Sequence, residues 1–486
     1  AGRCAVPVET MNDDPARCNT MSADIAMPAS RRAVAPRGDD RTAQRFSRLR
    51  VLNSAPPSEP RLRPFFVASL TIGLLAGAAW GVVMLVEILV GGRFTSVSIY
   101  RVNAHGHAQV YGFIGLLILG FAYEAFPRLW STSLPAPRLR RAVFIGMLVG
   151  IALHVVGWWL GTRPWSAWLS GMGGVIETLA LATFASQIVM LRARASVPFG
   201  ISSLFILVAT GLMVLHAAAE TVYSVALAGV GSRSELLALV SVWQAPLRNL
   251  QLHGSMLLMI VGVGMQMLSR MFSLPTVPAR RQAWVFGLLL SGMLSESISG
   301  VLLRLTGRHQ HAASLMLAWV GMGIAVALVV GTLRPWRVWR DGVGRMEGAP
   351  RFIRAALGWL VVWIVLLLLM PLHRWLSGLD FSHAYYGATR HALAGGFATF
   401  MMLGFVMQVV PSALGMPDRT PLAGARHSFK LLMIGCGGHV TLQLVADSFA
   451  MVLWALPAFA VMELLAIAWV AVPMLGRLLR PPGSNT

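Results

Sequence analysis

The residues best suited to metal chemistry in this sequence are its twelve histidines, which occur in a chain that is 56% apolar and only 12% charged. Imidazole is the commonest metal ligand among side chains, and ionisable groups are scarce inside apolar helices. His107 and His391 stand at equivalent places in two similar apolar segments. We therefore predict a buried metal or haem site, with these two histidines as its first candidate ligands.

Four further histidines are candidate ligands. His105 lies about 200° around a helix from His107, so both bind one centre only if the helix begins between them, and otherwise they serve different centres. His253 either binds a second metal next to a haem or is a core histidine bonded to a carbonyl group. His154 and His439 are candidates for a third and a fourth ligand.

Two pairs of polar residues have the spacing of one helical turn. His216, a further candidate metal ligand, precedes Glu220 by four positions, which lets a carboxylate orient an imidazole, although a polar contact between helices explains the pair equally well. Tyr111 follows His107 by four positions, which places a phenol beside a metal-bound imidazole. Four other histidines are expected in solvent-facing loops: His309, His311, His373 and His383. His427 is expected at the membrane surface.

Six glutamates also fall within apolar segments, where an unpaired carboxylate is strongly unfavourable. They either form a proton route or pair with arginines or backbone groups, and Glu124, four positions before Arg128, fits a pair. The six are Glu87, Glu124, Glu177, Glu220, Glu296 and Glu463.

The elements that must position these side chains are membrane-spanning helices. Apolar stretches of about 20 residues, enough to cross about 30 Å of hydrocarbon, recur from Phe65 onward. Such segments must be helical, because lipid offers no partner to an open backbone. We predict twelve spans, at about 65–90, 104–126, 142–160, 168–191, 200–229, 248–269, 283–303, 312–333, 354–373, 389–411, 428–446 and 450–475.

The net charge of +21 rests on 39 arginines and a single lysine. They form short clusters between apolar runs, which argues against the continuous basic stripe of a nucleic-acid-binding protein. Twenty basic residues follow even-numbered spans and nine follow odd-numbered ones, so we expect a bacterial inner-membrane protein with both termini in the cytoplasm. Most histidines then lie toward the outer leaflet. The expected organisation is a disordered cytoplasmic segment 1–64, a membrane domain 65–476 and a cytoplasmic tail 477–486.

The second, sixth and tenth spans share residues at an interval of 142 positions. A fixed period indicates a repeated structural unit. We predict three four-helix units, at about 65–195, 200–335 and 350–476, around a pseudo-threefold axis. The spans that follow carry His154, Glu296 and His439 at a similar depth. Three sets of residues occupy equivalent positions in the three spans, and we call each set a column: Gly112, Gly254 and Gly396; Gly120, Gly262 and Gly404; and Glu124, Gln266 and Gln408.

This all-α organisation resembles subunit I of the haem-copper oxidases, and local motifs resemble the NnrS family more specifically. His105-Gly-His107-Ala-Gln-Val-Tyr-Gly-Phe resembles the family's H-A-H-x-x-x-x-G-F signature. Arg390-His391-Ala-Leu resembles its R-H-A-L-T-x-G segment, and the stretch from Arg248 to His253 is also similar to NnrS-like proteins. The likeness spans residues 65–476.

The resemblance implies a membrane protein with haem and copper that is associated with nitric oxide metabolism and denitrification. From their positions in the motifs, the resemblance implies that the metal ligands are His105, His107, His253 and His391. The cofactor neighbourhood includes Tyr111, Arg248 and Arg390. The cysteines form no C-x-x-C-H motif, so the haem is non-covalent and of b type. A membrane or periplasmic cytochrome is the implied electron donor, and the implied ligand is a diatomic such as nitric oxide.

Two alternatives stay open. One is a divergent oxidase or nitric oxide reductase catalytic subunit of a respiratory chain, although 283–303 contains no histidine where oxidases carry a His-His pair for copper. The other is a proton-coupled secondary transporter. Transporters usually have two-fold repeats of five or six helices, which differ from the repeat here.

Overall fold

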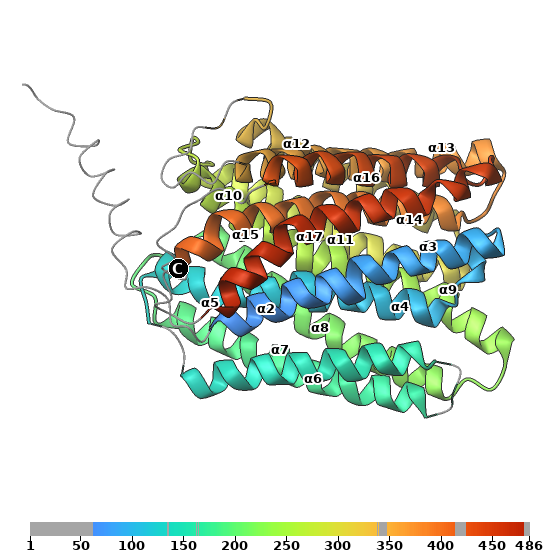
Figure 1. The fold of residues 1–486 in the computed structure, drawn as a ribbon, viewed down its shortest axis with the longest axis horizontal. Coiled ribbons are helices and arrows are strands. Elements are labelled where there is room, and N and C mark those ends of the chain that lie inside the picture. The colour runs from blue at the N-terminus through green and yellow to red at the C-terminus, as the bar shows by residue number, and fades with distance from the viewer. Residues whose placement is uncertain are drawn as a thin grey trace, which may run out of the picture. The chain divides into compact units, whose positions relative to one another are not determined.

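The computed structural model describes residues 62–133, 136–161, 163, 165–337, 339, 348–413 and 424–480. The predicted segment 1–64 and the end of the predicted tail lie largely outside these residues. Within the described ranges the chain is helical and has no strand (Figure 1). The described residues form twelve helical segments that are long and apolar enough to cross a membrane, which confirms the predicted number and places of the spans.

Seven of these spans are single α-helices, and the others combine helices of different types. The single helices are α6 (Pro137–Trp159), α7 (Ser166–Ala193), α8 (Ile201–Ala228), α11 (Ala279–Thr306), α12 (His309–Leu333), α13 (Ala349–Ser377) and α16 (Ala425–Val445). The first span joins α2 (Arg63–Ile72), the π-helical η2 (Gly73–Ala79) and α3 (Trp80–Gly91). The last joins the 3-10 helix η7 (Ala450–Trp454) and α17 (Leu456–Leu479), and another short 3-10 helix is η3 (Phe94–Ser96).

The second, sixth and tenth spans form the centre of the structure. In their most apolar stretches 94%, 89% and 78% of the residues are buried, against at most 50% in any other span. Each is an α-helix, a π-helical segment and a second α-helix. They are α4 (Ile99–His107), η4 (Ala108–Gly115) and α5 (Leu116–Trp130); α9 (Arg233–Asn249), η5 (Leu250–Leu257) and α10 (Leu258–Met271); and α14 (His383–His391), η6 (Ala392–Ala398) and α15 (Thr399–Ala413).

These three central spans also share local details that the sequence explains. Each begins after a serine, Ser98, Ser232 or Ser382, whose hydroxyl accepts a hydrogen bond from the backbone N–H three residues later. Their π-helical segments begin at Ala108, Leu250 and Ala392, which lie 142 positions apart. A π-helical turn rotates the residues that follow it and is frequent at functional sites. Two of the three segments directly follow a candidate ligand histidine.

One column of repeated glycines permits close helix packing. A Cβ atom on any of the three would overlap a side chain of the span that precedes it in the chain. This is the approach to a neighbouring helix that small residues permit in membrane proteins. The pairs are Gly120 with Phe65, Gly262 with Phe205, and Gly404 with Ile353.

We expect Gly262→Ala to lower the free energy of unfolding by about 1–3 kcal/mol, the usual effect of overpacking, because the new methyl group meets the Phe205 ring. Gly264→Ala is the matched control, since its Cβ would make only an ordinary contact with Leu268 at 3.7 Å. Thermal unfolding in detergent compares the two variants. Equal midpoints would contradict this explanation of the glycine column.

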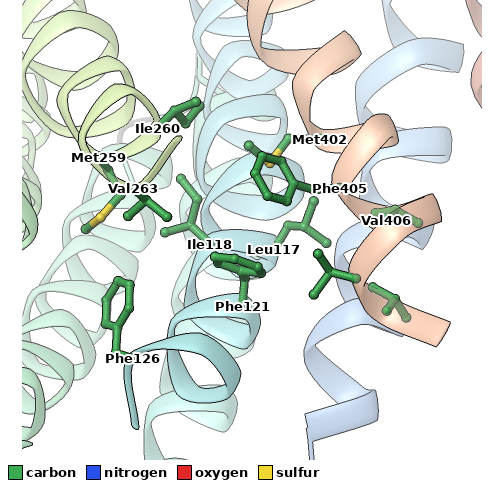
Figure 2. A pocket seen from close by; sticks show the side chains of 12 residues that line it. Leu117, Ile118, Phe121, Phe126, Met259, Ile260, Val263, Met402, Phe405 and Val406 are labelled. Atoms are coloured by element: carbon green, nitrogen blue, oxygen red, sulfur yellow. The ribbon is translucent and has the colours of Figure 1, made fainter. Parts of the chain in front are cut away.

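The centre is apolar where α5, α10 and α15 meet. Figure 2 shows side chains from these three helices around a cavity whose lining residues are all apolar. The lining includes residues at the 142-position interval: Ile118, Ile260 and Met402, and Phe121, Val263 and Phe405.

Candidate metal and cofactor sites

In the part of the chain that the structure describes, the candidate ligands separate into three clusters. Each combines a histidine of a central span with one residue from each of the two spans that follow. The first cluster is His107, His154 and Glu177, the second is His253, Glu296 and Trp319, and the third is His391, His439 and Glu463.

The first cluster joins α4, α6 and α7. Nε2 of His107 lies 2.9 Å from Oε1 of Glu177, and Nδ1 of His154 lies 3.6 Å from the same oxygen. The two imidazole rings stack with their centroids 4.0 Å apart. Each of the three side chains is at most 1% exposed. The three offer ligand atoms that all lie within 4.8 Å of one another, a group that could hold one metal ion.

A second layer of polar residues surrounds the first cluster. Oε2 of Glu220 lies 3.3 Å from Nδ1 of His107, and its Oε1 accepts from Nη1 of Arg248 at 2.9 Å. The hydroxyl of Tyr111 lies 2.7 Å from Nδ1 of His216, whose Nε2 lies 3.7 Å from Glu220. Glu220 therefore lies near His216 as predicted, and the ring of Tyr111 lies 4.9 Å from that of His107. Arg248 serves this layer as the partner of a buried carboxylate.

The second cluster joins η5, α11 and α12. Nδ1 of His253 lies 2.5 Å from Oε2 of Glu296, and Nε1 of Trp319 donates to Oε1 of the same carboxylate at 2.8 Å. The ring of Trp363 lies 4.9 Å from that of His253. The alternative of a core histidine bonded to a carbonyl is wrong, because the partner is a carboxylate on another span.

His253 and Glu296 lie on the wall of a partly open cavity of about 160 Å³. Aromatic side chains and three arginines also line it: Trp319, Trp363, Tyr385, Tyr386, Arg304, Arg374 and Arg390. The guanidinium of Arg390 lies 4.1 Å from the centre of the Tyr386 ring and donates to its hydroxyl at 2.9 Å. The cavity therefore combines an imidazole, aromatic walls and positive charge.

The third cluster joins α14, α16 and α17. The rings of His391 and His439 have centroids 3.9 Å apart, and Nδ1 of His439 lies 3.1 Å from Oε1 of Glu463. Nδ1 of His391 donates to the carbonyl of Gly387 at 3.2 Å. The His105 imidazole lies beside Gly81 of α3. Because α4 begins before His105 and continues through His107, the two side chains lie on different sides of the helix.

The six glutamates that the sequence singled out in apolar segments all have a partner. Glu87 pairs with Arg101 at 2.5 Å, and Glu124 pairs with Arg128 as predicted. The other four join the histidine clusters and the residues around them.

The sequence did not single out Glu177 or Trp319 as a site residue. One signal would have found them, because Glu177 and Trp319 are separated by the same 142 positions as His154 and Glu296.

The four histidines assigned to loops lie on helices, so that part of the prediction is wrong, although the side chains of His309 and His383 are exposed. His309 and His383 are the first residues of α12 and α14. His373 lies within α13, with its side chain 17% exposed, where it stacks on Tyr385 and comes within 3.5 Å of Asp447. The helix α13 continues past the predicted apolar stretch and ends at Ser377. Gly378, which follows, adopts the left-handed conformation that commonly ends a helix.

Trp319→Phe keeps an aromatic ring but removes the N–H that donates to Glu296. We expect the free energy of unfolding to fall by about 1.5–3 kcal/mol, the usual contribution of a hydrogen bond to a charged group. Trp336→Phe, at a residue that is 63% exposed, is the matched control. Thermal unfolding in detergent compares the two variants. If Trp319→Phe lowers the unfolding midpoint no more than Trp336→Phe does, the bond has no stabilising role.

No family model matches the chain, and no curated protein matches it significantly. The described residues nevertheless define a class of protein. It is an all-helical chain with twelve candidate membrane spans and clusters of buried histidines and carboxylates between them.

Proposed function

We propose that this protein is a membrane haem protein of the NnrS type that binds nitric oxide or a similar diatomic molecule. The observation that carries this proposal is the buried pair of His253 and Glu296 on the wall of the cavity that Trp319, Trp363 and Arg390 also line. The sequence motifs around His105, Arg248 and Arg390 add the resemblance to NnrS proteins.

The residues around the cavity fit a haem. A metal-binding histidine usually donates its other ring N–H to a carboxylate, and the contact of His253 with Glu296 through Nδ1 leaves Nε2 for iron. Trp319 and Trp363 provide flat apolar walls, and the arginines at the cavity can pair with carboxylate groups.

When bound, a haem with an open coordination position supplies the binding or activation of a diatomic ligand. The protein's own residues would control its setting. His253 would hold the cofactor, while Glu296 retains the proton on Nδ1 and fixes the plane of the imidazole. Trp319 holds Glu296 in place through its N–H, and Arg390 is oriented by Tyr386.

Copper, which the resemblance also implies, fits the third cluster by donor type. His391 and His439 bring two imidazoles together, and imidazole nitrogen suits copper. Glu463 would orient His439 in the way that a carboxylate orients a metal ligand.

Shared local features support three four-helix units like those of haem-copper oxidase subunit I. The π-helical segments, the glycine column and two of the cluster positions repeat at intervals of 142 positions. The surplus of basic residues after even-numbered spans supports a bacterial cytoplasmic membrane location with cytoplasmic termini.

The alternatives have less support. The cavity between the central spans is lined by apolar side chains only, which suits a packed core better than a solute path for a transporter (Figure 2). α11 supplies Glu296 and has no histidine for the copper pair of an oxidase.

Addition of nitric oxide to the reduced, haem-replete protein tests the proposed ligand. We expect a shift of the Soret band that saturates at one nitric oxide per haem. An unchanged spectrum at saturating nitric oxide would refute the proposal. Consumption of nitric oxide with a reduced cytochrome would favour the reductase instead.

A further inference from the structure

We propose that the first cluster is a separate, non-haem site for a divalent first-row transition-metal ion, held by His107, His154 and Glu177. The site lies between α4, α6 and α7, whereas the haem cavity is lined from α9 to η6. The inference stands on its own observations and does not require a haem in the cavity.

The distances within the cluster match those between ligands of one ion. Two ligand atoms at about 2.0–2.2 Å from an ion lie about 3.0–3.5 Å apart at the angles of tetrahedral or octahedral coordination. The separations of 2.9 Å from His107 to Glu177 and 3.6 Å from His154 to Glu177 bracket this range. Two imidazoles with one carboxylate are the ligand set of many non-haem iron and zinc sites.

His154 supplies an independent sign of a missing partner. Its side chain is 1% exposed, and among the described residues neither ring nitrogen has a hydrogen-bond partner. The contact of 3.6 Å with Glu177 is too long for a hydrogen bond. Buried polar atoms without a partner are rare, and an ion that is not part of the polypeptide is one explanation for them. A metal bound by Nδ1 would satisfy one of the two nitrogens.

The surrounding charges favour a cation in the cluster. Glu177 and Glu220 bring two negative charges into a buried region where Arg248 supplies one positive charge. Buried charges need compensation, and a divalent ion bound by Glu177 would provide it. Glu220, which lies 3.3 Å from Nδ1 of His107, would then orient that ligand as an outer carboxylate.

The rival explanation is an ion pair without metal, with a doubly protonated His107 between Glu177 and Glu220. This imidazolium would satisfy the two carboxylates. It would leave both nitrogens of His154 without a partner, and it would place a second imidazole against a cationic ring at 4.0 Å. The metal site gives a partner to Nδ1 of His154 as well as to His107, and among the described residues it leaves only Nε2 of His154 without one.

Metal analysis of the purified full-length protein tests the site. Elemental analysis gives total iron, zinc, copper, manganese and cobalt, and haem iron is measured separately by its pyridine adduct. We expect one non-haem ion per chain in the wild type. Glu177→Gln and His154→Ala should each lose this ion and keep the haem content of the wild type. Gln187→Leu, which changes another buried residue of α7 outside the cluster, should keep both.

Titration of the chelator-treated wild type with Co²⁺ provides a second readout that does not depend on the folding of any variant. We expect visible bands that saturate at one Co²⁺ per chain and disappear when Zn²⁺ is added. Absence of Co²⁺ binding, or non-haem metal that persists in both variants, would overturn the metal site and favour the imidazolium pair. Wild-type protein that contains the non-haem ion but no haem would instead count against the proposed function.

Discussion

His253→Ala is expected to purify with little or no haem, so that the Soret band of the wild type is lost. The substitution removes the imidazole that lies on the wall of the cavity and that Glu296 holds in place. Glu296→Gln keeps the ligand and weakens its orientation, so we expect a reduction in haem affinity of about 10–100-fold, typical for the loss of an outer-layer partner. The ratio of haem to protein, measured as the pyridine adduct, gives both effects.

His309→Ala is the matched control for these variants, since it removes an exposed imidazole at the beginning of α12. It should retain the haem content of the wild type. Full haem content in folded His253→Ala protein would contradict the role of His253 and transfer the ligand assignment to another histidine.

Arg248→Met is expected to produce the largest loss of stability. Arg248 is 7% exposed and Glu220 is 2% exposed, so their ion pair is buried. Removing one partner of a buried pair leaves an uncompensated charge and costs about 3–5 kcal/mol. Glu220 would then keep His107 and His216 as its neighbours, and thermal unfolding in detergent should show a much lower midpoint.

The double variant Arg248→Met with Glu220→Gln provides the internal control, because it removes both charges. We expect it to recover much of the stability that the single variant loses, since neutral groups of similar size replace the pair. If the double variant is as unstable as the sum of the two single variants, the two side chains act independently and the buried pair is not the cause.

Most of the fold could be predicted because hydropathy alone marks a membrane span. All twelve segments coincide with observed helices, and the largest difference is the sixth span, which begins at Arg233 and not near position 248. Its first part, α9, is more polar and includes Pro246, so it falls below the hydropathy of a lipid-facing helix. Ser232 nevertheless caps it, and the helix continues without a break into η5.

Within the candidate sites, residue pairs on one helix could be predicted and pairs between helices could not. Glu220 with His216 and Arg128 with Glu124 follow from the period of a single helix. The contact of His253 with Glu296 depends on how two helices are rotated about their axes, and the π-helical turn of η5 changes that rotation. A pattern read with a period of 3.6 residues cannot register this change.

The absorption spectrum of the purified wild-type protein, produced in haem-replete cells, tests the central claim most directly. We predict a Soret band with a stoichiometry of at least one haem per chain, and its loss in His253→Ala. A folded protein with no Soret band would contradict the haem assignment.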